Sequence, residues 1–415
     1  MPYFGKISYE DIQFATPGHG TTSGETFLRR SRIHPDSFIE RHALDAAMIP
    51  FRNFSGYIED VVPAVAAHAA IVTLEGTTAV AKTRKGVLID AGTNPQTIIE
   101  AAIDYLSDGG LLILGEGTFE ISSVITLKDY IFLFGMGNKT VIKIADGANC
   151  HGLALTDVSN VILANFMLDG NKDNQTIEVH GIRIYAANEN NENIILHNIK
   201  VKDWKLHGIA ITGGGTYYNL NVFADNILAE GCEGYGLTFY YVKRGFAKGI
   251  IATGGTEGGL QAKYGEDINI TGVVAYDNLN GIVIGASDNP IAGVNIQNCH
   301  LNNNEHNGLV IYSQTTECNV SNVVAKNNGK YGIRNEADGV RICNCICNSN
   351  GTVGLYDGIV LLDAQKCNVV NCTCNNNGRY GIQSHDTADY NNIKNCRASG
   401  NGDTNIKLDG AHDTA

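Results

Sequence analysis

Two histidines and two tyrosines between positions 180 and 240 have the residue types that acid–base chemistry needs. His180 and His207 could act as bases, because the ordinary pKa of histidine lies close to neutral pH. Tyr185 and Tyr240 could donate a proton to a leaving oxygen, or return a proton to the opposite face of a carbon atom. We therefore predict these four residues as the catalytic candidates of the chain.

Cationic and aromatic residues are interleaved with these four. Arg183 and Lys263 could neutralise a carboxylate on a substrate, and His151 and Tyr235 continue the spacing on either side as further binding candidates. Neutralising a carboxylate acidifies the neighbouring C–H bond, so the whole set suits removal of a proton beside a carboxylate. The simpler alternative is that histidines recur because similar side chains tolerate stacking.

A repeated sequence motif must position these residues. From residue 152 onward, a Gly or Asn followed by an aliphatic residue returns every 22 to 29 residues. Such a period indicates one structural unit per repeat, each stacked on its neighbours. We call the first residue of each motif a landmark. The landmarks are Gly152, Gly181, Gly208, Gly236, Gly259, Gly281, Gly308, Gly332, Gly381 and Asn405, with either Gly354 or Gly358 between the last two glycines.

The repeating unit consists of strands. Residues 193–201 alternate apolar and polar side chains with a period of two and are rich in β-branched residues. Short strands separated by Asn and Gly turns, returning at this interval, predict an all-β fold. That fold is a right-handed parallel β-helix, a solenoid of about 11 turns spaced about 4.8 Å apart.

Two columns of similar residues support this period. Four residues before successive landmarks stand Asn304, Asn328, Asn350, Asn377 and Asn401. Nine residues before them stand Cys299, Val323, Cys345, Cys372 and Cys396. We predict that the asparagines turn a corner in the left-handed region and that their amides bond along the stack. The second column is predicted to point inward.

The 11 cysteines could form a ladder of buried thiols, disulfides or a metal site. Free cysteine is among the most buried residue types, and the Cys-x-Cys pairs at 343–347 and 372–374 coincide with the inward column. Buried thiols are therefore the predicted state. We expect no cofactor and no catalytic metal, and leave a structural calcium ion open.

Composition excludes several classes of partner. A net charge of −13 argues against nucleic acid, whereas an acidic glycan would need only a local basic patch. No apolar run is long enough to span a bilayer, so no membrane insertion is expected. Residues 1–6 lack the basic and apolar regions of a signal peptide.

The repeat divides the chain into two predicted domains. Residues 1–88 do not carry the repeat and are expected to form an N-terminal module or arm of unknown role, through which the chain could form a homo-oligomer. Residues 89–415 form the β-helix. Asn94 and Pro95 open a helix with an apolar face, as cap and first residue. We expect this helix to cover the open end of the solenoid.

The order of segments from Asp90 onward resembles the catalytic module of mannuronan C5-epimerases, within the wider pectate-lyase-like β-helix superfamily. The resemblance lies in residues 94–104, 109–119, 135–143 and 168–174, and in the closing segment 380–408. It covers about 325 residues. The resemblance implies the β-helix fold and action on an acidic, uronate-containing polysaccharide.

The same resemblance implies which face carries the site. The epimerases use residues about three before, one before, two after and four after each landmark. One before stand His151, His180, His207 and Tyr235; two after stands Arg183; four after stand Tyr185, Tyr240 and Lys263. All eight candidates therefore fall on the implied face.

The strand that is catalytic in those epimerases differs in this chain. The family pattern is Tyr-Gly-aromatic-Asp-Pro-His, whereas residues 207–212 read His-Gly-Ile-Ala-Ile-Thr. Ala210 and Thr212 stand where the pattern has Asp and His, and Glu178 stands where it has Lys. Any epimerase chemistry must therefore use other residues.

Residue types and resemblance together predict a polysaccharide lyase or C5-epimerase that removes the C5 proton of a uronate. Two alternatives stay open. One is a non-catalytic or tailspike-like glycan-binding protein of a virion or cell surface. The other is an inverting glycoside hydrolase using Glu178 and Glu233, whose backbones would lie about 10 Å apart across two turns. Each hypothesis expects an extracellular or virion-associated protein.

Overall fold

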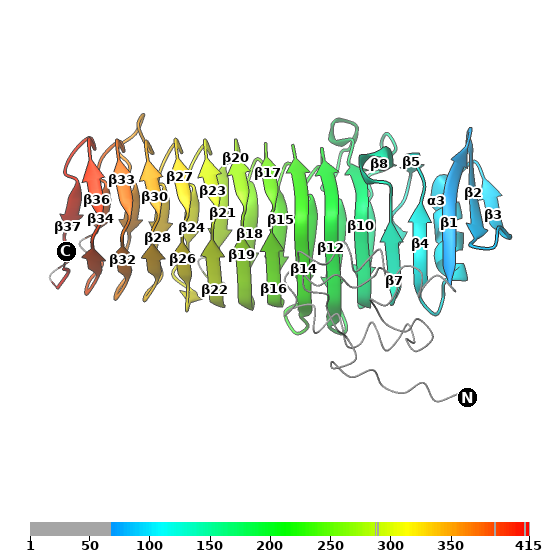
Figure 1. The fold of residues 1–415 in the computed structure, drawn as a ribbon, viewed down its shortest axis with the longest axis horizontal. Helices are drawn as coiled ribbons and strands as arrows, with labels where there is room; N and C mark the ends of the chain where they lie inside the picture. Colours follow the sequence, from blue (N-terminus) through cyan, green and yellow to red (C-terminus); the bar gives the residue numbers. More distant parts are fainter. Residues whose placement is uncertain (1–67, 287, 289, 386, 411, 415) are drawn as a thin grey trace, which may run out of the picture.

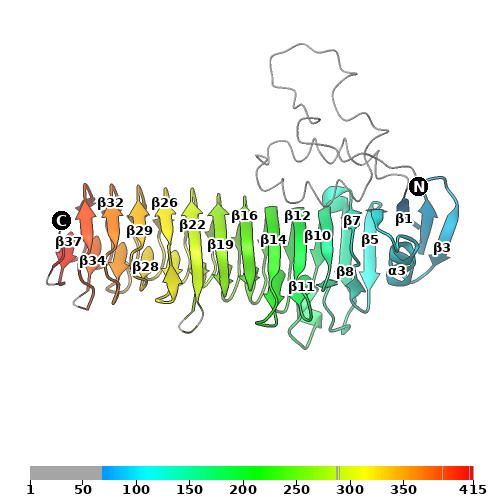
Figure 2. The ribbon, with the colours of Figure 1, turned by 90° about the horizontal axis from the view of Figure 1, so that it is seen from below.

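The computed structural model describes residues 68–286, 288, 290–385, 387–410 and 412–414. They form a long rod, with helix α3 (Pro95–Tyr105) and three strands near one end and the last strand at the other (Figures 1 and 2). Of the predicted N-terminal module, residues 1–67 lie outside this description.

Two sheets run the length of the rod. Sheet B contributes one strand to each turn and has 12 strands, so the solenoid has about 12 turns, close to the predicted number. Its strands are β6 (Ile125–Thr126), β9 (Leu153–Thr156), β11 (Ile182–Ala186), β13 (Ile209–Gly213), β15 (Tyr235–Tyr240), β18 (Gly258–Lys263), β21 (Asn280–Ile284), β24 (Leu309–Ile311), β28 (Ile333–Asn335), β31 (Ile359–Leu361), β34 (Ile382–Ser384) and β37 (Ile406–Leu408).

Sheet A has 25 strands and forms the rest of each turn. Its strands are β1 (Ala69–Glu75), β2 (Thr78–Thr83), β3 (Leu88–Gly92), β4 (Gly110–Leu114), β5 (Gly117–Ile121), β7 (Ile131–Phe134), β8 (Thr140–Ile144), β10 (Ser159–Asp169), β12 (Asn191–Lys202), β14 (Asn219–Glu230), β16 (Val242–Lys248), β17 (Ile251–Thr253), β19 (Gly265–Thr271), β20 (Val274–Tyr276), β22 (Ile291–Gln297), β23 (His300–Asn302), β25 (Thr315–Thr316), β26 (Asn319–Ser321), β27 (Val324–Lys326), β29 (Arg341–Cys343), β30 (Ile346–Asn348), β32 (Asn368–Val370), β33 (Thr373–Asn375), β35 (Asn392–Lys394) and β36 (Arg397–Ser399). Two 3₁₀ helices, η4 (Gly137–Lys139) and η5 (Lys172–Asn174), lie in the connections.

The predicted strand at 193–201 is part of β12, which pairs in parallel with β10 and β14. Ile194 and Leu196 point into the core, and Ile199 and Val201 do so further along. The inward phase therefore shifts by one residue between the two pairs. Asn198 lies at this shift with a positive φ of 51°, the left-handed region that lets an extended chain bend. The solenoid corner is thus encoded inside the strand.

Crowding between turns explains the landmark glycines. A Cβ added at any of them would lie 2.4 to 2.9 Å from the carbonyl oxygen of the next landmark, a separation that real Cβ atoms do not show. Gly358 makes this contact with Gly381, and Gly332 makes it with Gly358. Gly358 is therefore the landmark left open by the sequence. No further described turn stacks on Asn405, so a side chain is tolerated there.

The predicted asparagine ladder is confirmed. Each side-chain amide donates to the carbonyl oxygen of the next asparagine, from Asn304 to Asn328 at 3.0 Å and onward to Asn401. The prediction that these residues adopt the left-handed conformation is wrong. That conformation belongs to the residue before each, for example Asn303 and Asn327. The side chain of each ladder asparagine instead points inward. Its amide there supplies hydrogen bonds in place of the backbone hydrogen bonds that the corner interrupts.

All 11 cysteines are free, and eight of them are buried. Cys299, Cys345 and Cys372 of the inward column have at most 1% exposure. Burial raises the pKa of Cys232 and Cys318 to about 12, which keeps these thiols protonated. This agrees with the predicted ladder of buried thiols.

Helix α3 begins as predicted. Asn94 is its cap, and the Asn94 carboxamide oxygen accepts the Gln96 N–H at 3.1 Å. Ile98, Ile99 and Ile103 join the solenoid core. The helix lies at the same end as β1–β3 (Figure 1); that it covers the open end stays a prediction. No helix among the residues described is long and apolar enough to cross a membrane.

Strands of the solenoid sheet already occur before the predicted domain boundary at residue 88. β1 pairs in parallel with β4, with Ala70 opposite Leu112, and it pairs antiparallel with β2. Ala70 and Val72 belong to the same core as the later turns. The described residues before 88 are therefore continuous with the first turn.

Candidate functional site

The outer face of sheet B brings the predicted candidates together. Strands β11, β13, β15 and β18 lie side by side in parallel, with Arg183 opposite Ala210, Ala210 opposite Thr238, and Thr238 opposite Gln261. Residues at equal distances from their landmarks consequently form rows along the rod. We call the eight predicted residues on this face the N-terminal site.

The row one residue before the landmarks is a stack of rings. The His151 and His180 rings are 5.0 Å apart and nearly parallel, and His180 and His207 are 5.2 Å apart. Tyr235 continues the row at 5.9 Å from His207, and Tyr240 meets His207 edge-on at 6.3 Å. The row predicted from spacing is therefore a continuous contact.

Backbone hydrogen bonds fix the tautomer of two of these histidines. Nδ1 of His207 accepts the Tyr235 N–H at 3.0 Å, and Nδ1 of His151 accepts the His180 N–H at 3.0 Å. In a neutral imidazole the proton must then be on Nε2, which can only donate. Nδ1 of His180 is buried without a hydrogen-bond partner among the residues described. His180 alone is free to present a lone pair on Nε2.

Burial keeps the central histidines uncharged. It lowers the pKa of His180 to about 3, with help from the neighbouring His207, His151 and Arg183. Burial also lowers the pKa of His207 to about 4, aided by the charge of Lys263. The sequence-based expectation of a base with a near-neutral pKa is not met, because the stack removes both rings from water.

Two cations on this face rest on tyrosine rings. The Arg183 guanidinium lies 4.7 Å from the Tyr185 ring centroid, and the Lys263 ammonium lies 4.0 Å from that of Tyr240. Burial lowers the pKa of Lys263, and the charge of Glu257 opposes that shift. Within the described part of the chain, neither Arg183 nor Lys263 makes an ion pair.

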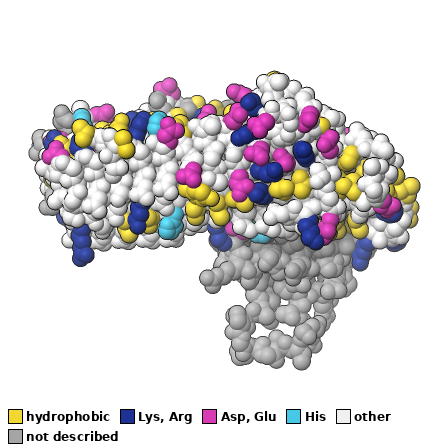
Figure 3. Space-filling model, turned by 90° about the horizontal axis from the view of Figure 1, so that it is seen from above, with side chains coloured by type: hydrophobic (Ala, Val, Ile, Leu, Met, Phe, Trp, Pro, Cys, Tyr) yellow, Lys and Arg dark blue, Asp and Glu magenta, His cyan; other side chains and the backbone are white. Residues whose placement is uncertain are grey.

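Several lysines near the site are paired across turns. Lys and Arg gather with Asp and Glu over the half of the rod nearer to α3 (Figure 3). Lys202 lies 2.8 Å from Asp169, and Lys200 lies 2.6 Å from Glu230, each across neighbouring turns. The unpaired state of Arg183 and Lys263 therefore distinguishes them from these lysines.

The tyrosines of the site are proton donors. Burial raises the pKa of Tyr240, and the neighbouring Tyr235 and Glu257 raise it further. Burial likewise raises the pKa of Tyr235. The Tyr240 hydroxyl donates to the Gln261 side chain. Both phenols are consequently neutral at physiological pH.

Sequence reasoning missed Glu257 and Thr238. Glu257 lies two residues before its landmark, outside the rows considered, and partial burial of its carboxyl raises its pKa, with Lys263 opposing and Glu178 adding to the shift. Thr238 is fully buried, and its hydroxyl has no partner among the described residues. No local sequence signal marks either residue, because only the neighbouring turns create their environments.

The carboxylate pair considered for hydrolysis is not a free pair. Glu233 lies 3.1 Å from Lys205. Glu178, two turns away from Glu233, has no such ion pair among the residues that the structure describes. A cross-turn ion pair of this kind stabilises stacking. The face therefore offers neutral imidazoles, phenols and two free cations.

The stacked parallel strands and their outward rows define a β-helix protein. A family model described as "Right handed beta helix region" matches residues 180–339 and 292–414. Together these segments cover more than half of the chain, which therefore belongs to the right-handed β-helix family. The handedness predicted from the sequence is confirmed.

Curated relatives include enzymes and phage proteins. The chain is 26% identical over 270 residues to mannuronan C5-epimerase AlgE5 of Azotobacter vinelandii, covering 60% of this chain and 22% of that protein. It is 29% identical over 194 residues to the pre-neck appendage protein of Bacillus phage phi29, covering 40% of this chain and 20% of that protein. The matches thus span about a fifth of these relatives' length.

Solved structures share the fold. The A-module of AlgE4 from Azotobacter vinelandii superposes with a TM-score of 0.67 at 21% identity, covering 77% of this chain and 95% of that one. The Dettilon tailspike protein superposes with a TM-score of 0.53 at 15% identity, covering 75% and 64%. Identities this low establish the architecture alone.

Proposed function

We propose that this chain binds an acidic polysaccharide on the outer face of sheet B, between β11 and β18. The observation that supports this most directly is the pair of cations, Arg183 and Lys263, each resting on a tyrosine ring and neither paired with a carboxylate of the described chain. On a protein of net charge −13, cations left free at one face suit an anionic ligand.

Desolvation makes these cations responsive to a carboxylate. The lowered pKa of Lys263 means that its charged form is incompletely solvated. A ligand carboxylate would replace the missing solvation with a charge-assisted hydrogen bond. Three strand spacings, about 14 Å, separate the strands of Arg183 and Lys263, so the two cations suit carboxylates on different sugars of one chain.

The relatives support a polysaccharide ligand. The epimerases are named for mannuronan, an acidic polysaccharide, and the tailspike and appendage proteins belong to phages. By analogy, we place this chain outside the cell or on a virion, and we take uronate-containing glycans as its ligand class.

Proton abstraction at C5 is the second candidate function, and the free Nδ1 of His180 favours it. With its proton on Nδ1, His180 could accept the C5 proton on Nε2 while Arg183 neutralises the uronate carboxylate. In elimination, the C5–H electron pair forms the C4–C5 double bond, the C4–O bond breaks, and Tyr240 protonates the leaving oxygen. In epimerisation a proton returns to the opposite face of C5. A pKa of about 3 makes His180 a weak base, so binding ranks first.

The binding test uses alginate and polygalacturonate as probes, with a neutral glucan for comparison, by calorimetry at low salt. Arg183→Gln and Lys263→Gln should each weaken uronan binding about tenfold or more, because each removes a charge-assisted hydrogen bond. Arg397→Gln, in β36 of sheet A, removes an exposed arginine away from the site and serves as the matched control. Wild-type binding that is absent, or equal for the neutral glucan, would overturn the proposal.

Activity assays separate binding from chemistry. Absorbance of unsaturated uronate detects elimination, deuterium uptake at C5 of the intact polymer detects epimerisation, and new reducing ends without that absorbance detect hydrolysis. His180→Gln should abolish either of the first two activities. Binding without any of the three signals would leave a glycan-binding protein.

A further inference from the structure

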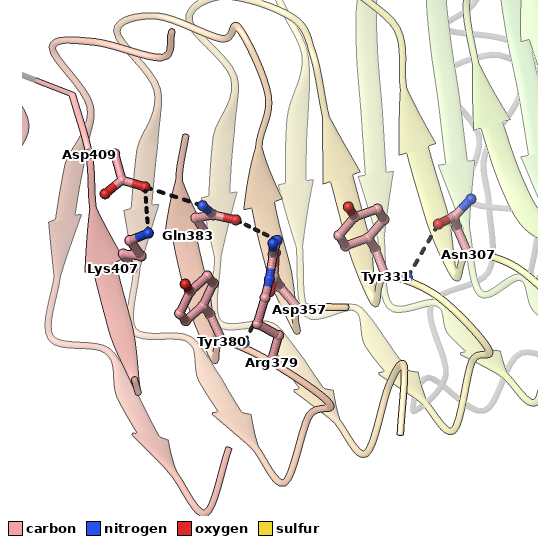
Figure 4. Close-up of polar contacts among 8 residues, drawn as sticks. All are labelled: Asn307, Tyr331, Asp357, Arg379, Tyr380, Gln383, Lys407 and Asp409. Carbon is pink, nitrogen blue, oxygen red and sulfur yellow. Dashed lines mark hydrogen bonds and ion pairs between the residues drawn. The ribbon is translucent and has the colours of Figure 1, made fainter. Parts of the chain in front are cut away.

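The turns at the far end of the rod carry a second group of polar residues on the same face. We call it the C-terminal cluster. Figure 4 shows its two parts, Asn307 bonded to Tyr331 and, separately, Asp357 and Arg379 linked through Gln383 to Asp409 and Lys407. Seven of its eight members lie in the rows one before, two after and four after a landmark, as in the N-terminal site, whereas Arg379 lies two before Gly381. Its members are Asn307, Tyr331, Asp357, Arg379, Tyr380, Gln383, Lys407 and Asp409.

A buried carboxylate anchors the cluster. Asp357 is fully buried and accepts from Nε of Arg379 at 2.9 Å, from its Nη2 at 2.8 Å and from the Tyr380 N–H at 3.0 Å. Nη2 of Arg379 also donates to the Gln383 oxygen at 2.6 Å, and the Gln383 amide donates to Asp409 at 3.3 Å. Bonds from several directions hold the guanidinium in one position.

Two cations then meet on one tyrosine. The Arg379 guanidinium lies 4.7 Å from the Tyr380 ring centroid, and the Lys407 ammonium lies 5.1 Å from it. A hydrogen bond with Tyr380, followed by the nearby Asp409, raises the pKa of Lys407 and keeps it charged. Arg379 and Lys407 are 28% and 40% exposed, so both reach solvent.

The cluster shares its cation-on-tyrosine contacts with the N-terminal site, but here Arg379 and Lys407 are also paired with carboxylates. Four cation-on-tyrosine pairs lie on this face in the described chain, two at each group. The intervening turns carry the uncharged Val283 and Val310, which pack with Tyr235 and Tyr312. Two polar groups with rigid cations therefore flank an apolar stretch along one line.

We propose that the C-terminal cluster is a second subsite for the same acidic polysaccharide, which lies along the outer face of sheet B parallel to the rod. This inference rests on the proposed function of the N-terminal site. Lys407, the more exposed cation, would take a ligand carboxylate, and Arg379 would bind hydroxyl or carboxylate oxygens beside it.

Geometry makes the inference depend on ligand length. From β18 to β34 there are five strand spacings, about 24 Å. A short fragment can occupy one group only, whereas a polymer can reach both. The second contact of a polymer is then intramolecular, which raises apparent affinity by up to 10²–10⁴.

A structural role is the competing explanation, because the same bonds tie the last three turns together. The two explanations differ for Lys407, whose ion pair with Asp409 at 3.3 Å is partly exposed and therefore contributes little to stability. Lys407→Gln should therefore leave the melting temperature nearly unchanged, whichever explanation holds. Only the subsite predicts a loss of binding.

The test is calorimetry of the full chain with alginate polymer and with mannuronate fragments of two or three sugars. Wild-type protein should bind two fragments per chain, and Lys407→Gln one. Polymer affinity should fall at least about tenfold in Lys407→Gln and recover in Lys407→Arg. Lys394→Gln, which removes an exposed lysine from β35 of sheet A in the neighbouring turn, is the matched control.

The outcomes separate this inference from the function it rests on. One fragment per chain, lost in Arg183→Gln and kept in Lys407→Gln, would overturn the second subsite and leave the proposed function intact. An equal loss in Lys394→Gln would show a general charge effect and would also overturn it. Wild-type protein that binds neither probe would overturn both proposals.

Discussion

Replacing His207 with Asn should make the protein less sensitive to acid. His207 is 8% exposed, and burial lowers its pKa to about 4, whereas an unfolded chain has a histidine pKa of about 6.5. Between these values the unfolded state binds the extra proton, so stability falls as pH falls. The Asn carboxamide oxygen can replace Nδ1 as acceptor of the Tyr235 N–H, which His207 accepts at 3.0 Å.

The size of the effect follows from the two pKa values. At pH 5, protonation of His207 stabilises the unfolded form by about RT ln(1 + 10^1.5), on the order of 2 kcal/mol, whereas it stabilises the folded form by almost nothing. At pH 7.5 protonation of His207 stabilises neither form appreciably. The wild-type protein should therefore lose about 2 kcal/mol more than His207→Asn between these pH values. The little solvent around His207 leaves this contribution largely unscreened.

Urea unfolding of both proteins at pH 7.5 and pH 5.0 measures this difference. Comparing the proteins removes the part of the His180 contribution that does not depend on His207, which is one of the groups that lower the pKa of His180. His300→Asn, at an exposed position in β23, is the matched control and should behave like the wild type. Equal pH dependence in wild type and His207→Asn would refute the conclusion that the stacked ring is held neutral.

Two further predictions concern the solenoid itself. Gly308→Ala should destabilise the fold by about 1–3 kcal/mol in urea unfolding, because its Cβ would lie 2.6 Å from the Gly332 carbonyl oxygen. Gly339→Ala, in open space at a φ of +68°, should cost only about 1–2 kcal/mol of backbone strain. A larger loss of stability in Gly339→Ala would contradict the crowding argument. A thiol reagent at pH 8 should label at most the three partly exposed cysteines of the native protein, Cys150, Cys343 and Cys396, before unfolding exposes the rest; rapid labelling of all eleven would contradict their burial.

The fold was predictable because its main constraint recurs at every turn. Stacking brings each landmark against the carbonyl of the next, so glycine is required at one position per period. The ambiguity between Gly354 and Gly358 arose because the insertion lies after Asn350, before the landmark. A spacing of four residues after Asn350 points to Gly354, so the sequence leaves both glycines open, whereas backbone crowding requires Gly358.

Conformation at the corners was less predictable than their side-chain contacts. Asn328 was correctly expected to bond along the stack, which it does at 2.9 Å to Asn350. The left-handed residue is its neighbour, Asn327. Two adjacent asparagines look alike in a sequence, and only the direction of the side chain relative to the core separates the ladder residue from the corner residue.

The chemistry of the candidate site depends on contacts between turns. Spacing placed the three histidines in one row, and the rings do stack. Their low pKa values follow from how completely the neighbouring rings exclude water, which no single turn encodes. For the same reason Glu257 was not recognised, because its raised pKa depends on burial and on Glu178 from three turns away.

Binding and chemistry can change separately on such a face. Each turn supplies one residue to each row, so Ala210 occupies its position between Arg183 and Thr238 without shifting either strand. The mannuronan C5-epimerase pattern has Asp at that position and His at the position of Thr212. Ala210 and Thr212 supply no such acid–base pair, and the cations of β11 and β18 lie on either side of them. Polysaccharide binding is therefore the function that we propose for this face.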